Sequence, residues 1–79
     1  MSWASLHPDV QTVAQTTLTQ KQLDVWKLEL AGASENQIAR ILDCSRWTVR
    51  NHLATVTDKL SRAGIRQSVT GRFYLKETA

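Results

Sequence analysis

The clearest pattern in the chain is a stripe of apolar residues between positions 49 and 60. Val49, Leu53, Val56 and Leu60 follow one another at steps of four, three and four, which is the spacing of one helix face. Alternate positions in this stretch do not separate apolar from polar residues, which excludes a half-buried strand. Burial of this stripe can outweigh the modest helix propensity of the many Thr and Val residues around it. The pattern therefore predicts a helix over residues 46–60.

A shorter helix is predicted upstream, starting with a capping box formed by Thr19 and Gln22. We expect it to run to about Ala31, because Gly32 accepts the left-handed conformation that ends many helices. Its apolar positions make a broad buried face, formed by Leu23, Val25, Trp26, Leu28 and Leu30.

A second capping box, Ser34 with Gln37, starts a helix of about two turns. We expect its apolar residues to face inward: Ile38, Ala39, Ile41 and Leu42. After a short turn, Ser45 is placed to cap the helix over 46–60. Two short helices joined by a tight turn form the layout of a helix-turn-helix.

The two ends of the chain carry weaker patterns. Near the N-terminus the apolar positions Trp3, Leu6, Val10 and Val13 fall at helical steps, so an extra helix there is one alternative. Near the C-terminus Ile65, Val69 and Phe73 are spaced four apart and predict a fourth helix over 66–75. Gly71 would cost that helix about 1 kcal/mol relative to alanine. Close approach of two helices at a dimer seam formed by Val69, Gly71 and Phe73 would explain why a glycine is present in this helix.

The predicted fold class is all-α: a compact helix-turn-helix bundle of about four helices, with or without an extra N-terminal helix. Residues 1–17 form an N-terminal extension, and residues 18–79 form the helix-turn-helix domain. At 79 residues with 42% apolar content, the chain suits one small globular domain. No apolar run is long enough to cross a membrane, and no signal-peptide pattern is present, so we expect a cytoplasmic, nucleoid-associated protein.

Charge is distributed unevenly along the chain. Residues 1–45 contain three basic and five acidic residues, a net charge of −2, whereas residues 46–79 contain seven and two, a net charge of +5. This asymmetry favours a polyanionic partner, most simply nucleic acid, although a solvated basic face is the alternative.

Catalytic and metal-binding patterns are absent from the sequence. The two histidines, His7 and His52, lie in no metalloprotease or triad motif, and there is no glycine-rich phosphate loop. Cys44, the single cysteine, is expected to be a small buried apolar group. We therefore predict a protein that is not an enzyme and needs no cofactor or metal.

The helix over 46–60 has an outer face suited to the DNA major groove. With the apolar stripe pointing inward, the outermost positions are Trp47, Asn51, Ala54, Thr55 and Asp58. Arg46, Arg50 and Thr57 line one flank, and Thr48, His52 and Lys59 line the other. Major-groove recognition needs short or hydrogen-bonding groups facing base edges, with cations meeting the phosphates at the sides.

Each candidate contact has a chemical reason and a simpler alternative. Arg50 can donate two hydrogen bonds to guanine and Asn51 can pair with adenine, while Ala54 can touch a thymine methyl group. Trp47 is predicted to contact bases, although it could instead pack over a neighbouring helix. The predicted DNA backbone contacts are Ser45, Arg46, Thr48, His52 and Lys59. For all of these, an ordinary solvated or structural role is the alternative.

Residues 18–60 resemble the LuxR-type (GerE-like) helix-turn-helix. The resemblance rests on the sequence G-x-S-x-x-x-I-A from Gly32 to Ala39, on T-V-R-N-H-L from Thr48 to Leu53, and on Lys59-Leu60. It implies that the helix starting after Ser45 enters the major groove and that a final helix forms the dimer interface. Two carboxylates of the family pattern are glutamines here, Gln22 and Gln37, and the segment after Leu60 is longer.

The sequence thus favours a sequence-specific double-stranded DNA-binding transcription regulator, acting as a homodimer on two half-sites. RNA polymerase or another regulatory protein is a further expected partner. One alternative is a DNA-packaging or recombination accessory protein. Another is a protein-interaction adaptor with Trp3, Trp47 and Phe73 exposed as anchors. We expect either a free-standing regulator or a domain of a larger protein.

Overall fold

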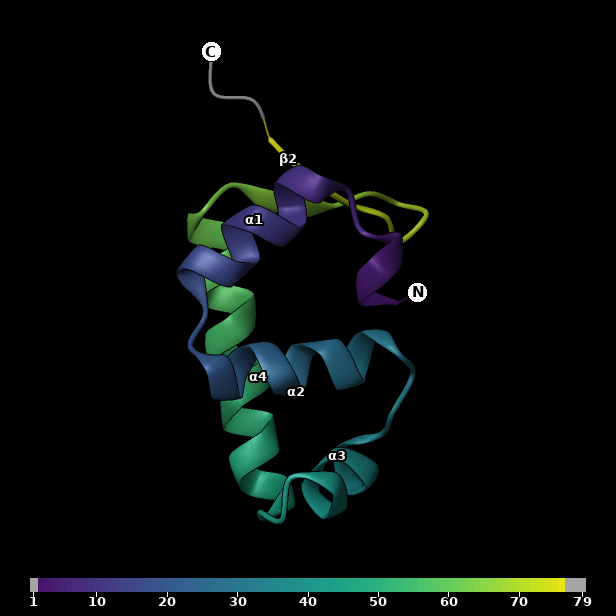
Figure 1. The fold of residues 1–79 in the computed structure, drawn as a ribbon, viewed down its shortest axis with the longest axis vertical. Helices are drawn as coiled ribbons and strands as arrows, with labels where there is room; N and C mark the ends of the chain where they lie inside the picture. The colour runs from purple at the N-terminus through teal and green to yellow at the C-terminus, as the bar shows by residue number, and fades with distance from the viewer. Residues whose placement is uncertain (1, 77–79) are drawn as a thin grey trace.

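The computed structural model describes residues 2–76, and Figure 1 shows its elements stacked along one long axis. They are the 3₁₀ helix η1 (Trp3–Ser5), the helices α1 (Pro8–Thr17), α2 (Gln20–Leu30), α3 (Glu35–Ile41) and α4 (Arg46–Arg62), and the strands β1 (Ile65–Gln67) and β2 (Phe73–Leu75). The predicted all-α class is confirmed, since the two strands form only a small antiparallel hairpin. None of the described helices has the length and apolar content needed to cross a membrane.

Both predicted capping boxes are present and fix where α2 and α3 begin. Thr19 Oγ1 accepts a hydrogen bond from the Gln22 N–H at 3.3 Å, and Gln22 Oε1 accepts one from the Thr19 N–H at 3.1 Å. Ser34 and Gln37 repeat the exchange at 3.2 and 2.8 Å. Because helix termini leave backbone N–H groups without partners, these side chains set the helix starts locally.

The core has two parts, and α4 contributes to both. The smaller part lies in the helix-turn-helix and contains Val25, Ile38, Ala39 and Val49, with Cys44 and Leu53 packed against it. The larger part joins α1, α2, the C-terminal half of α4 and β1 around Trp26, Val56 and Leu60. Cys44 is only partly buried, but its packing against apolar neighbours agrees with the predicted structural role.

The N-terminal extension contains a helix, which was one of the two alternatives predicted from the sequence. Pro8 occupies the first turn of α1, where its missing N–H costs nothing, and His7 Nδ1 accepts a hydrogen bond from the Asp9 N–H at 3.1 Å. Val10 and Ala14 on its inner face are buried. Helix α1 therefore covers part of the larger core.

The predicted helix over 66–75 is wrong. This segment forms a hairpin in which Ile65 pairs with Leu75 and Gln67 with Phe73. The turn places Gly71 at φ 88°, and the Gly71 N–H donates to the Ser68 carbonyl oxygen at 2.9 Å. A short hairpin loop of this kind needs a residue in the left-handed region, which glycine adopts without strain. Gly71 is thus explained by the turn and not by two closely approaching helices.

Trp26 of α2 is held between the two ends of the chain. Its ring meets Trp3 edge-on at 5.9 Å between centroids and Phe73 edge-on at 5.6 Å. Trp3 and Phe73 are both partly buried, so the expectation that they stand exposed as partner anchors is wrong. Of the three proposed anchors only Trp47 is well exposed, at 72%.

Candidate nucleic-acid interface

The turn between α3 and α4 sets the direction in which α4 projects. Helix α3 ends with the Cys44 N–H donating to the Ala39 carbonyl oxygen at 2.9 Å, the six-to-one bond of a Schellman motif. Asp43 supplies the left-handed residue this motif requires, at φ 53°. Ser45 then caps α4 as predicted, its Oγ accepting from the Thr48 N–H at 3.1 Å. The turn is therefore fixed by hydrogen bonds at both helix ends.

The buried and exposed faces of α4 agree with the helical wheel drawn from the sequence. Val49, Val56 and Leu60 are buried, and Leu53 is partly buried beside the smaller core. The five positions expected to lie outermost are all exposed: Trp47, Asn51, Ala54, Thr55 and Asp58. Trp47 is among the exposed large apolar residues, so most of its ring is available at the start of the outer face.

Arg50 stands at the edge of this face and is paired with an acidic residue of α3. Its Nη2 lies 3.3 Å from Glu35 Oε1, and its Nε donates to Glu35 Oε2 at 3.5 Å. The arginine side chain is still 63% exposed. Glu35 was not among the residues predicted from the sequence, because residue spacing does not reveal a contact between side chains fifteen positions apart on crossing helices.

The remaining candidates for DNA backbone contact differ in their exposure and in the hydrogen bonds that their side chains make. Arg46 is exposed, whereas Thr48 and His52 are partly buried. The hydroxyl groups of Ser45 and Thr48 are hydrogen-bonded to each other at 2.9 Å. Lys59 points toward α2, where its Nζ donates to Gln22 Oε1 at 2.9 Å. The partner of Lys59 is therefore the neutral amide of Gln22 and not a carboxylate.

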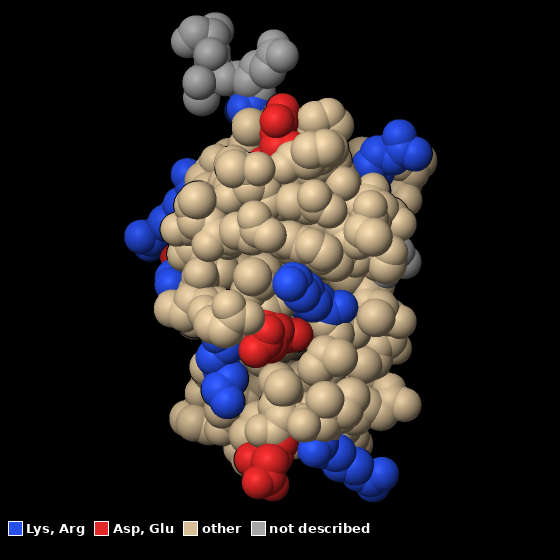
Figure 2. Space-filling view, in the orientation of Figure 1, with Lys and Arg blue, Asp and Glu red and all other residues tan. Residues whose placement is uncertain are grey.

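Basic side chains continue along α4 beyond its outer face. Figure 2 shows one side of the molecule, mostly uncharged, with blue side chains along the left edge beside the upper half of α4 and others lying singly at the centre, the upper right and the lower right. Basic residues on α4 or directly after it are Arg46, Arg50, Lys59, Arg62 and Arg66. The two acidic partners nearby are Glu35, which pairs with Arg50, and Asp58, which pairs with Arg62 at 3.1 Å.

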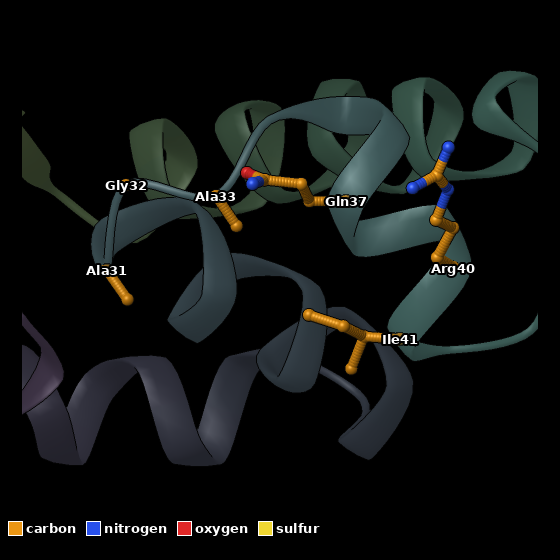
Figure 3. A pocket seen from close by; sticks show the side chains of 6 residues that line it. All are labelled: Ala31, Gly32, Ala33, Gln37, Arg40 and Ile41. Atoms are coloured by element: carbon orange, nitrogen blue, oxygen red, sulfur yellow. The ribbon is translucent and has the colours of Figure 1, made fainter.

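A shallow hollow of about 440 Å³ lies on another side of the helix-turn-helix, between the α2–α3 link and α3. Figure 3 shows Ala33 and Ile41 on either side of it. Ile41 was expected to face inward, but it is 61% exposed. The reason is its direction on the helix: at about 100° per residue Ile38, Ala39 and Leu42 share the face that packs in the smaller core, and Ile41 lies at the edge of that face away from Ala39.

The three residues predicted to form a dimer seam lie in the hairpin. Val69 is fully exposed at its tip, Gly71 forms the turn, and Phe73 packs against Trp26. Within residues 2–76 no group of three or more His, Cys, Asp or Glu side chains is arranged to hold a metal ion.

A model of a known protein family matches the helix-turn-helix part of the chain. The family model described as bacterial regulatory proteins, luxR family (GerE), matches residues 16–70, more than half of the chain. The matched segment runs from the end of α1 through α2, α3 and α4 into the hairpin. No curated protein and no solved structure matches the chain significantly.

Proposed function

Since the chain belongs to the luxR family of bacterial regulatory proteins, a family of DNA-binding transcription regulators, we propose that it recognises a specific duplex sequence by placing α4 in the major groove. The observation that carries this proposal is the outer face of α4. It exposes Trp47, Arg50, Asn51 and Ala54 within two turns, on a helix whose other face is buried. An α-helix with its side chains is about as wide as the major groove of B-DNA, so this face can meet base edges.

We assign base reading to four side chains. The Arg50 guanidinium suits guanine O6 and N7, and the Asn51 amide suits adenine N6 and N7. Ala54 allows close approach and can contact a thymine methyl group, and Trp47 extends the apolar contact at the N-terminal end of α4. The exposure of all four supports this assignment.

The proposed phosphate contacts lie beside these residues. Ser45, Arg46 and Thr48 surround the N-terminus of α4, where the helix dipole and free N–H groups attract phosphate. His52 and Lys59 lie further along the helix. Lys59 would exchange its hydrogen bond with Gln22 for a phosphate oxygen.

We further propose that two copies bind together on two half-sites about one helical turn apart. The hairpin is the proposed seam, and the full exposure of Val69 beside the Gly71 turn supports this. Phe73 packs on Trp26, so its contribution to the seam is to hold the hairpin in place. Contact with RNA polymerase or another regulatory protein would then transmit binding to transcription.

Selection of the preferred sequence from random duplexes, followed by affinity measurements at fixed salt, tests the proposal. Arg50→Ala should weaken binding to the selected duplex by about 1–3 kcal/mol and relax the preference at one base pair, and Asn51→Ala should do so at a neighbouring one. Sizing of the complex reports whether one or two copies bind. Unchanged affinity in both variants, or no sequence preference in the wild type, would contradict the proposal.

A further inference from the structure

Within residues 2–76 the pair of Glu35 and Arg50 is the one ion pair that joins two helices. It links the first turn of α3 to the second turn of α4, so it crosses the helix-turn-helix at the edge of the outer face. Both side chains reach solvent, with 35% of Glu35 and 63% of Arg50 exposed. Exposed ion pairs contribute little to stability, so stabilisation alone is a weak reason for this contact.

The geometry of the pair leaves Arg50 able to read a base. A guanidinium group has five N–H donors, and Glu35 takes only the side formed by Nε and Nη2. Among residues 2–76 no acceptor is bonded to the end formed by Nη1 and the second hydrogen of Nη2, and this end carries the two parallel donors that match guanine O6 and N7. One guanidinium can therefore be held by Glu35 and bind a guanine at the same time.

From this geometry we infer that Glu35 is a positioning residue for DNA recognition, which orients the Arg50 guanidinium toward the base before the duplex arrives. The inference rests on the proposed function. Immobilising a long side chain on binding costs about 0.5–1.5 kcal/mol, and a side chain already oriented loses less. The N···O distances of 3.3 and 3.5 Å exceed those of tight charge-assisted bonds, so the guanidinium can still adjust to the base.

The carboxylate has an opposing effect that makes the inference testable. Glu35 carries negative charge near the expected path of the phosphates, so its removal should tighten binding to every duplex alike. A positioning role acts differently: it concerns only the base pair that Arg50 reads. The ratio of affinities for the preferred duplex and for a duplex changed at that base pair separates the two effects.

The experiment compares Glu35→Gln, Arg50→Ala and the double variant with the wild type. Asp58→Asn is the matched control, because it removes one negative charge from the outer face of α4 without touching Arg50. Affinities are measured by fluorescence anisotropy at one salt concentration. The probes are the duplex selected by the wild-type protein and three duplexes changed at the base pair that Arg50→Ala relaxes.

Glu35→Gln should lower the affinity ratio by about 2- to 12-fold, the factor to which about 0.5–1.5 kcal/mol converts. In the Arg50→Ala background the same substitution should leave the ratio unchanged. Asp58→Asn should tighten binding to all four duplexes by one common factor. The midpoint of urea unfolding for Glu35→Gln should stay near the wild-type value.

Two outcomes would overturn the inference while leaving the proposed function standing. In one, Arg50→Ala relaxes the base preference but Glu35→Gln leaves the ratio at its wild-type value. In the other, Glu35→Gln lowers the ratio equally with and without Arg50, which would mean that it acts through the fold. If the wild-type protein preferred no sequence at all, the proposed function itself would have failed, and the inference with it.

Discussion

Replacement of Phe73 by alanine tests whether residues 65–75 form a hairpin packed on the core. Phe73 is partly buried and meets Trp26 edge-on, with 5.6 Å between ring centroids. Truncating a fully buried Phe costs about 3–5 kcal/mol, and an aromatic pair of this geometry adds about 0.5–1.5 kcal/mol to simple burial. Allowing for the exposed part of the ring, we expect Phe73→Ala to lower the free energy of unfolding by about 2–3 kcal/mol.

That loss is large for a domain of this size, whose total stability should be about 4–12 kcal/mol at typical values per residue. Urea unfolding followed by tryptophan fluorescence and by circular dichroism measures it, and the melting temperature should fall by about 8–24 °C. Val69→Ala is the control, because Val69 is fully exposed in the hairpin and should change stability by less than about 0.5 kcal/mol. In a helix over 66–75 the two residues would share one face, so equal losses for Phe73→Ala and Val69→Ala would refute the reasoning.

Two substitutions of α2 should each stabilise the protein, for different electrostatic reasons. Gln22→Glu keeps an acceptor for Thr19 and gives Lys59 a charged partner near a helix N-terminus, so urea unfolding should show a gain of about 0.3–1 kcal/mol that shrinks as salt is added. Burial, and secondarily the charge of Glu35, raises the pKa of Glu29 above its ordinary 4.5, so its ionised form opposes folding. Glu29→Gln should therefore have a larger free energy of unfolding than the wild type at pH 7. Urea unfolding at falling pH should show the two free energies converging below about pH 4.5. A difference between variant and wild type that is independent of pH would contradict this.

The helix-turn-helix could be predicted from the sequence because its boundaries depend on local chemistry. The capping boxes starting at Thr19 and Ser34 and the cap at Ser45 act within three residues of each helix start. The stripe from Val49 to Leu60 then fixed which face of α4 is exposed. Periodicity and capping were sufficient for these elements, since no distant contact has to be known to place them.

The C-terminal segment could not be predicted by the same means. Ile65, Val69 and Phe73 satisfy helical spacing, yet the Ser68–Gly71 turn and the packing of Phe73 on Trp26 favour a hairpin. A short loop containing glycine between β-branched and aromatic residues was the signal available for that alternative.

The contact of Glu35 with Arg50 was unpredictable for another reason, because it depends on how α3 crosses α4. Spacing along the chain carries no information about that crossing, and nothing in the local sequence links Glu35 to Arg50. Tertiary geometry is needed to see that the two side chains meet.

The central claim, that the outer face of α4 contacts DNA, is tested most directly by amide chemical shifts. Spectra of the labelled protein would be recorded while the selected duplex is added at fixed salt. We predict that the largest changes fall on residues 45–55, with smaller ones at the start of α3. Changes confined to α1 and the hairpin, with residues 45–55 unaffected, would contradict the account.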